Sequence, residues 1–405
     1  MSKHLEHVDL IIVGGGMVGL AAACALKDSG MHVMVVERAE PVVRKSLGRD
    51  CRVSAIVLGN VRILQGMGVW DHIADTGPMH AMRIWDNQHS GGIRFDASEI
   101  EEEALGYLVE NSKLQAALLK VFHQHDNLEY CCPATIESVE WHGSSDGDHV
   151  EVILDDGRGF STPLIVGADG AQSWLRNQAE IGIYTHDYGQ KGIVATVRPQ
   201  MNHRGTAYQR FLPTGPLAML PMSDGLCSIV WSAEHAEADR LMALDDLAFM
   251  EDLNLTFGPM LGRIEEVGDR AAFPLVARLA RHLVQPRLAL IGDAAHTIHP
   301  LAGLGVNLGL RDAMVLAQEI VDAKRFKEDW GDMDVLNRYM KQRLPDVLSI
   351  MGSMGLFHHL FTHNLPGLPE LRGLGMRLVG NSGPIKQLLM QNSTGMNLPV
   401  PKQIS

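Results

Sequence analysis

Cysteine is scarce in this chain of 405 residues, and its pattern excludes several classes of protein. The number of cysteines is odd, and no two of them form a C-x-x-C pair. A small disulfide-stabilised secreted scaffold and a dithiol redox enzyme are therefore both excluded. The pattern is typical of a reducing compartment, and we expect a cytoplasmic protein. The five cysteines are Cys24, Cys51, Cys131, Cys132 and Cys227.

The chain also has few positively charged residues and few long apolar runs. Lys and Arg number 35 against 48 Asp and Glu, so the formal net charge is −13. Because nucleic-acid binding requires clustered cations that neutralise phosphates, we expect no nucleic-acid partner. Residues 10–26 carry no charge, but they include four glycines and form too short a run for a membrane span. We therefore expect neither a transmembrane helix nor a targeting peptide.

Glycine, by contrast, is arranged in motifs, and the first is GGGMVG at residues 14–19, directly after a short apolar run. Gly14 allows a tight turn, Gly16 lets the backbone approach a pyrophosphate, and Gly19 lets the following helix pack closely on the strand. The N-terminus of that helix would hold the phosphates. Glu37, at the end of the second apolar run, stands where an acid binds an adenosine ribose. An acid there favours FAD or NAD over NADP.

Two more glycine motifs follow far downstream. GADG occupies residues 167–170, and GDAAH occupies residues 292–296. Three such motifs in one chain predict a large dinucleotide bound by distant parts of one fold. Gly303, Leu304 and Gly305 precede a predicted helix, so their N–H groups and the helix dipole can face negative charge on a bound ligand.

Apolar patterning predicts an α/β protein with a Rossmann-like FAD-binding domain, an inserted β-sheet substrate domain and a helical C-terminal tail. We assign residues 1–80, 106–182 and 276–345 to the first domain, and residues 81–105 and 183–275 to the second. The local patterns behind this division are helices at 112–124, 234–257 and 306–323, a hairpin over 149–170 and strands within 190–232.

The tail, residues 346–405, differs in composition from the rest of the chain. It is rich in methionine, contains Phe357 and Phe361, and has four basic residues against two acidic ones. This composition favours contact with an anionic membrane surface or a partner protein. A helical cap on the core, with methionines filling gaps, is an equally open interpretation.

Together these motifs resemble the class A flavoprotein monooxygenases, the flavin-dependent aromatic hydroxylases. The resemblance covers about residues 5–345. More narrowly, residues 52–56, 109–112, 167–176 and 292–303 are similar to the ubiquinone-biosynthesis hydroxylases. Many relatives carry Gly-Gln-Gly where this chain has Leu304 between two glycines, so a glutamine side-chain contact is lost while the backbone is kept.

The resemblance implies a monooxygenase with FAD that uses NAD(P)H and O2, through a flavin C4a-hydroperoxide, to hydroxylate a prenylated phenol or benzoquinol. It implies that Glu37 holds the adenosine ribose, Asp293 holds the ribityl chain, and the pair at 169–170 serves both FAD and transient NAD(P)H docking. The implied cofactor-binding set is Gly14, Gly16, Gly19, Glu37, Arg38, Arg52, Asn111, Asp169, Gly170, Gly292, Asp293, Gly303, Gly305 and Asn307.

No residue is assigned a catalytic role, but a flavin-facing loop and a substrate pocket are predicted. The loop comprises Pro300, Gly303, Leu304 and Gly305. The inserted sheet must shield the flavin from water, and its predicted apolar lining is Phe211, Pro213, Met219 and Pro221. The histidine pairs His296/His299 and His359/His363 lack a completing carboxylate or cysteine, so no metal site is expected.

Other functions remain open for a chain of this pattern. A halogenase or prenyl reductase shares the fold, although the W-x-W motif of such halogenases is missing. A non-catalytic flavin-binding subunit of a multi-enzyme quinone-biosynthesis complex is a further alternative. In either case, the expected location is cytoplasmic or peripheral at the inner membrane face.

Overall fold

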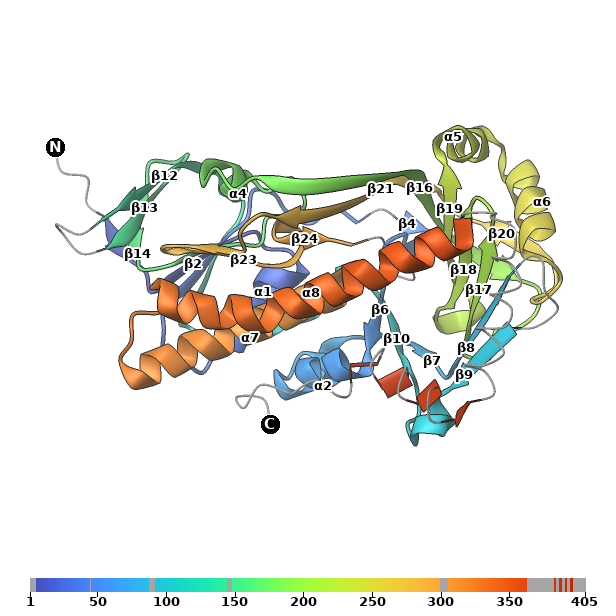
Figure 1. Ribbon diagram of the computed structural model, residues 1–405, viewed down its shortest axis with the longest axis horizontal. Helices are drawn as coiled ribbons and strands as arrows, with labels where there is room; N and C mark the ends of the chain where they lie inside the picture. The colour runs from blue at the N-terminus through green and yellow to red at the C-terminus, as the bar shows by residue number, and fades with distance from the viewer. Residues whose placement is uncertain are drawn as a thin grey trace.

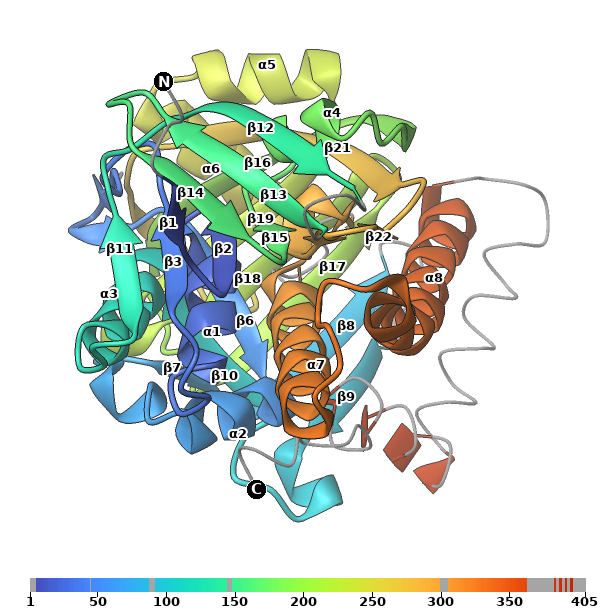
Figure 2. The same cartoon turned by 90° about the vertical axis from the view of Figure 1, so that its left-hand side faces the viewer.

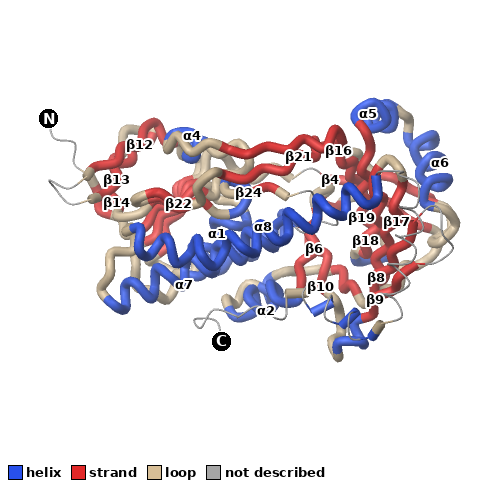
Figure 3. The backbone as a smooth tube through the Cα atoms, in the orientation of Figure 1, coloured by secondary structure: helices blue, strands red, loops and turns tan. Residues whose placement is uncertain are grey.

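The protein is elongated, with sheets at both ends and one long helix running between them (Figure 1). The computed structural model describes residues 5–43, 45–86, 92–143, 148–298 and 305–362, with short stretches between 382 and 395. The strands form two groups, which are joined along one edge of the molecule by β16 (Ile183–Pro199) and β21 (Ala271–Ala280) (Figure 3).

A six-stranded sheet forms the centre of the first group. Its order among the described residues is β11-β3-β2-β15-β23-β22, and all neighbours pair in parallel except β22 with β23. Every residue of the four inner strands is buried, as in parallel sheets that are covered on both faces. The strands are β2 (Leu10–Val13), β3 (Val33–Val36), β11 (Leu128–Cys131), β15 (Ile165–Gly167), β22 (Val284–Gln285) and β23 (Leu288–Leu290).

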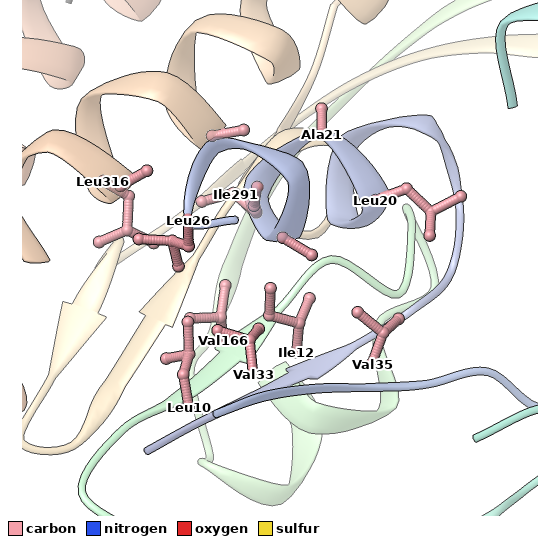
Figure 4. Packing of buried hydrophobic residues seen from close by; sticks show 14 of the residues in the cluster. Leu10, Ile12, Leu20, Ala21, Leu26, Val33, Val35, Val166, Ile291 and Leu316 are labelled. Carbon is pink, nitrogen blue, oxygen red and sulfur yellow. The ribbon is translucent and has the colours of Figure 1, made fainter. Parts of the chain in front are cut away.

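Helices cover one face of this sheet. Leu20 and Leu26 pack against Ile12 and Val33 in the same buried cluster, and Leu316 lies beside Leu26 (Figure 4). Burying such side chains contributes roughly 1.5–3 kcal/mol each, so this layer is a main source of stability. The covering helices are α1 (Met17–Ala25), α3 (Asn111–Phe122), α7 (Gly305–Phe326) and α8 (Met333–Thr362).

A four-stranded sheet, in the order β1-β14-β13-β12, covers the other face (Figure 2). Its Val150, Val152 and Phe160 belong to the same buried cluster as the six-stranded sheet. The hairpin predicted over 149–170 is only partly correct, because two strands follow its turn instead of one. Pro163 cannot donate to a ladder, and it separates β14 from β15, which enters the other sheet. The strands are β1 (Glu6–His7), β12 (Ile136–His142), β13 (His149–Leu154) and β14 (Gly159–Thr162).

A nine-stranded sheet forms the second group. Along its main path the order is β24-β21-β16-β19-β18-β17-β8-β9, with β20 paired to β16, counted over the described residues. One face packs against α5 (His235–Ala243) and α6 (Asp246–Phe257) in a separate buried cluster. The remaining strands are β8 (Ala81–Asp86), β9 (Gly92–Asp96), β17 (Thr206–Leu212), β18 (Gly215–Pro221), β19 (Cys227–Glu234), β20 (Ile264–Val267) and β24 (His296–Thr297).

A small sheet of β6, β10 and β7 lies between the two groups. Its Ala55 and Leu108 pack with Ala207, Ala218 and Leu220 on the second face of the nine-stranded sheet. The elements not yet placed are β4 (Lys45–Ser46), β5 (Arg49–Asp50), β6 (Val53–Val57), β7 (Gly77–Met79), β10 (Gly106–Glu110), α2 (Leu58–Gly66), α4 (Trp174–Gln178), and the 3-10 turns η1 (Trp70–His72), η2 (Ala97–Ile100), η3 (Ser223–Gly225) and η4 (Gly292–Ala294).

The predicted fold class is confirmed, as are the helices expected at 112–124, 234–257 and 306–323, which correspond to α3, to α5 with α6, and to α7. The domain boundaries stay a prediction, since β16 and β21 run through both groups. None of the helices described is both long and apolar enough to cross a membrane.

The tail begins as part of α8, which continues to Thr362. Further on, Lys386 binds Glu99 at 2.7 Å, Met390 packs beside Ala97 and Leu105, and the Thr394 carbonyl accepts from the Gly59 N–H. These contacts agree with the cap interpretation for the end of the tail. Phe357 and Phe361 have side chains outside the described part of the structure, as does the whole of His363.

A buried ionic cluster joins α7, α8 and the turn η4. The Asp312 carboxylate accepts from the Gly292 N–H at 3.0 Å and from the Arg343 Nε at 2.8 Å, and it lies 2.6 Å from the His296 Nε2. Asp312 is fully buried. Burial alone would raise the pKa of Asp312, but His296 and Arg343 bring it below its ordinary value. Asp312 is therefore ionised in the folded protein and fixes three segments to one another.

We predict that Asp312→Asn destabilises the fold by about 3 kcal/mol, the lower end of the range for a broken buried ion pair, because the partly exposed Asp346 then remains as the counter-charge of the buried Arg343. The pKa of Asp312 is lower in the folded state than in the unfolded chain. Its contribution is therefore complete above the ordinary carboxyl pKa and is lost as the pH falls through the lowered folded value. Urea unfolding at several pH values checks both points.

The matched control is Asp156→Asn, which removes an exposed carboxylate paired with Arg158. This control should change the stability little at any of the pH values tested. Equal stability of Asp312→Asn and the wild type at pH 7 would contradict the role given to the cluster.

Candidate functional site

The three glycine motifs leave the six-stranded sheet at one edge. Val13 pairs with Gly167, and Gly167 pairs with Leu290, at the carboxyl ends of parallel strands. Each motif therefore begins where its strand ends. In open α/β sheets, ligands bind outside this edge.

The first motif has the close packing that its glycines require. Gly14 has φ +112°, and a Cβ there would collide with the Ala168 carbonyl, while a Cβ on Gly19 would collide with the Gly14 carbonyl. Gly16 differs, because nothing described lies within 4 Å of its would-be Cβ. No side chain among the described residues caps the α1 N-terminus, and its first turn contains no acid. Open space and free helical N–H groups are what a bound phosphate needs.

Glu37 lies directly beside this turn. Its Oε2 accepts from the Gly15 N–H at 2.7 Å, and its Oε1 accepts from the Ala39 N–H at 3.2 Å. On the other side of the turn, the Gln115 Nε2 donates to the Gly15 carbonyl at 2.7 Å. Sequence reasoning missed Gln115, although it stands four residues after Asn111 on one helix and so shares its face.

The second motif lies against the first through Ala168 and is joined to the third through Arg176. The Arg176 guanidinium is buried and donates to the Ala294 carbonyl at 2.9 Å and to the Ala171 carbonyl at 3.1 Å. Asp169 accepts from the Leu175 N–H through Oδ2, while its Oδ1 is buried without a hydrogen-bond partner among the described residues. An unpaired buried carboxylate oxygen is costly, which favours a donor supplied by a ligand.

The third motif packs onto α1. A Cβ on Gly292 would lie 3.1 Å from a methyl of Val18. Asp293 is exposed, yet desolvation by the surrounding protein raises the pKa of its carboxyl. A side chain that is accessible but crowded on most sides lies in a recess. Its neighbour His296 is buried and engaged by Asp312, so it is held within the structure.

The other predicted cofactor residues differ in exposure and in the contacts that they make. Arg38 and Arg52 are exposed. Asn111 starts α3 and accepts from the Ser54 hydroxyl at 2.7 Å. Asn307 is buried, and its side-chain amide already bonds the Val57 N–H and the Ala55 carbonyl, so it acts in joining α7 to β6. Of the flavin-facing loop, Pro300, Gly303 and Leu304 lie outside the described residues, as does His299, and Gly305 begins α7.

The predicted substrate-pocket residues do not share one face of the nine-stranded sheet. Met219 packs in the cluster with α5 and α6, on the face away from the small central sheet. Its neighbours Ala218 and Leu220 point the opposite way, toward that small sheet. Phe211 pairs with Pro216 and alternates in phase with Ala207, so it lies on this second face.

Two residues complete this set. Pro213 lines a cavity of about 490 Å3, and Pro221 is buried at the end of β18. Successive side chains of a strand point to opposite faces, so Met219 points away from the face on which a ligand could lie between the sheets.

The residues brought together fit FAD. The glycine turn and the uncapped α1 suit a pyrophosphate, Glu37 lies beside this turn, and Asp169 and Asp293 present carboxylates to the same edge.

Comparison with known proteins agrees with this geometry. Residues 7–351 match the family described as an FAD binding domain. The chain is 37% identical over 388 residues to ubiquinone hydroxylase UbiL of Rhodospirillum rubrum, which covers 96% of this chain and 89% of that protein. It is 36% identical over 394 residues to 3-demethoxyubiquinol 3-hydroxylase of Escherichia coli, covering 96% and 99%.

Solved structures show the same fold at lower identity. p-Nitrophenol 4-monooxygenase PnpA of Pseudomonas putida superposes with a TM-score of 0.79 at 17% identity, covering 97% of this chain and 99% of that one. HpxO of Klebsiella pneumoniae, solved as a variant complexed with FAD, gives a TM-score of 0.71 at 20% identity, covering 96% and 98%. The chain therefore belongs to the FAD-binding monooxygenases, in the family of the ubiquinone-biosynthesis hydroxylases.

Proposed function

We propose that this protein hydroxylates the aromatic ring of a prenylated phenol or benzoquinol in ubiquinone biosynthesis, with FAD as cofactor and NAD(P)H and O2 as co-substrates. The observation that carries the proposal is the meeting of three motifs at one sheet edge. It occurs in a chain that aligns over nearly its whole length with hydroxylases named for ubiquinone and demethoxyubiquinol.

Bound FAD would take up reducing equivalents from NAD(P)H and activate O2. The protein's own residues bind and orient this group. The turn from Gly14 to Gly19 and the α1 N-terminus would hold the phosphates, Glu37 the adenosine ribose and Asp293 the ribityl chain. The second face of the nine-stranded sheet, with Ala218 and Leu220, would keep water from the ring system.

We predict that Glu37→Ala weakens FAD binding by about 1.5–3 kcal/mol, the scale of a hydrogen bond to a charged group. This corresponds to roughly a ten- to hundredfold higher dissociation constant, measured by fluorescence titration of the apoprotein. The matched control is Glu40→Ala, an exposed acid on the same loop. Unchanged affinity in Glu37→Ala would remove this residue from the site.

We predict that the purified, FAD-loaded protein oxidises NAD(P)H faster when a short-chain prenylated phenol is present. The product should contain one additional oxygen atom by mass spectrometry. Stimulated oxidation that yields only peroxide would indicate binding without hydroxylation. Full occupancy by FAD with no response to any phenol or quinol would favour the non-catalytic flavin subunit instead, and a halogenated or reduced product would favour the other enzymes of this fold.

We also propose that the tail contacts an anionic lipid surface, so that the cytoplasmic enzyme works at the inner membrane face. A prenylated substrate resides in a bilayer, and the tail combines apolar side chains with a local excess of cations. The contacts of Lys386, Met390 and Thr394 tie its end to the body of the protein. We therefore assign the lipid contact to the basic residues Arg372 and Arg377, which lie outside the described part of the chain.

We predict that the double variant Arg372→Gln with Arg377→Gln sediments less with phosphatidylglycerol vesicles than the wild type does, while its FAD content is unchanged. Each cation near such a surface contributes about 1 kcal/mol. The control carries Arg158→Gln and Arg240→Gln, two exposed arginines elsewhere. Equal sedimentation of all three proteins would leave the tail as a structural cap, and co-sedimentation with other quinone-biosynthesis proteins would point to a protein partner.

A further inference from the structure

A cavity of about 490 Å3 opens where three parts of the nine-stranded sheet meet. Tyr188 and Gln190 line it from β16, Pro213 from the turn between β17 and β18, and Glu234 and His235 from the junction of β19 and α5. The volume is in the range of small-molecule sites and suits a substituted aromatic ring.

Gln190 is the unusual member of this lining. Only 4% of its surface is exposed, and its Nε2 donates to the Thr214 carbonyl at 3.0 Å. A carbonyl can only accept, so this bond fixes which end of the amide faces Thr214. The Gln190 Oε1 is buried and has no hydrogen-bond partner within the described residues. A buried acceptor without a donor is unfavourable, so an occupant that supplies a donor to it would be favoured.

A bulge in β16 relative to β21 lies at Gln190, which keeps its regular pairing with β19 on the other side. The pairing of β16 with β21 shifts register between Asp187 and Lys191, and Gly189 within this bulge has φ +68°. Bulges of this kind re-aim a side chain and are frequent beside active sites. Gln190 pairs with Glu234, in phase with Ser232 and Val230, and so faces the same side as Ala218 and Leu220.

The cavity is connected to the strand that follows the third glycine motif through two neighbouring strands. β24 pairs with β21 through Thr297 and Arg278, and β21 pairs with β16 through Val276 and Asp187. The end of β24 at Thr297 therefore lies opposite Arg278, two residues along β21 from Val276, which pairs with Asp187 at the start of the bulge. The loop predicted to face the flavin follows directly in the sequence.

We propose that Gln190 is a substrate-binding residue whose Oε1 accepts a hydrogen bond from a hydroxyl on the ring to be hydroxylated. This inference rests on the proposed function and adds a specificity determinant to it. Tyr188 and Pro213 provide apolar surface beside the ring. A free phenol or quinol satisfies the buried acceptor, whereas a methyl ether at the same carbon has no hydrogen to donate and leaves the acceptor unpaired.

The test compares 2-allylphenol with its methyl ether, 2-allylanisole, by isothermal titration of the FAD-loaded protein. The wild type should bind the phenol about tenfold or more tightly than the ether. Gln190→Leu and Gln190→Met should bind both ligands with similar affinity, because neither side chain contains the acceptor. The matched control is Gln209→Leu, another buried glutamine of this sheet that does not line the cavity, and it should keep the wild-type preference.

The outcomes separate this inference from the proposed function. If the wild type binds the phenol and the ether with equal affinity, Gln190 is not the acceptor, whatever the variants show. A preference kept by a Gln190 variant with normal flavin absorbance and thermal midpoint also overturns it. If Gln209→Leu alone loses the preference, the ring lies elsewhere on the sheet and the assignment is wrong, while the proposed substrate class stands. A wild type that binds neither ligand overturns both.

Discussion

The site depends on the ionised carboxylate of Asp312, buried where α7, α8 and the third glycine motif meet. Its two oxygens engage the Gly292 N–H, His296 and Arg343. A full charge in this position is tolerated only because every side of it meets a donor or a counter-charge. The cluster therefore sets where Asp293 lies relative to α7, and with it the geometry of one side of the proposed flavin site. Arg176 extends the same constraint to the second motif through the Ala294 carbonyl.

A second constraint comes from the nine-stranded sheet, which is buried on two different faces. One face bears large side chains such as Met219 and Ile229, which form one buried cluster with Phe249 of α6. The other face carries small and polar residues such as Ala218 and Ser228 among larger ones such as Leu220. Small side chains leave room between this sheet and its neighbours. The residues of the nine-stranded sheet that pack on α5 and α6 therefore serve stability. Buried polar groups on the other face, such as Gln190, are available for recognition.

The protein is acidic overall, yet its family binds an anionic dinucleotide. The residues around the glycine turn show how this is reconciled. Gly16 and the uncapped start of α1 offer backbone N–H groups and the positive end of a helix dipole, which need no cationic side chain. In the site proposed above, the acids Glu37, Asp169 and Asp293 would face hydroxyl groups of the dinucleotide and not its phosphates. Net charge therefore says little about this site, because recognition is local and largely by the backbone.

The sequence by itself determined the fold class, the three motifs and the family, because these follow from local rules. An apolar strand that ends in a glycine turn must place that turn at a sheet edge, and glycine spacing reports close backbone approaches such as that of Gly19 to Gly14. Helical periodicity placed α3 and α7 to within a few residues for the same reason.

Only the tertiary structure decided which side chains face the site. Met219 and Ala218 are adjacent and both apolar, and nothing in their types shows which one turns toward α5 and α6. Asn307 has the chemistry of a ligand residue, but its amide is taken up by Ala55 and Val57, some 250 residues away. The partnership of Asp312 with His296 and the unpaired Oε1 of Gln190 are likewise properties of contacts between distant segments. Hydrogen-bond saturation depends on every neighbour in space, and a linear pattern does not contain that information.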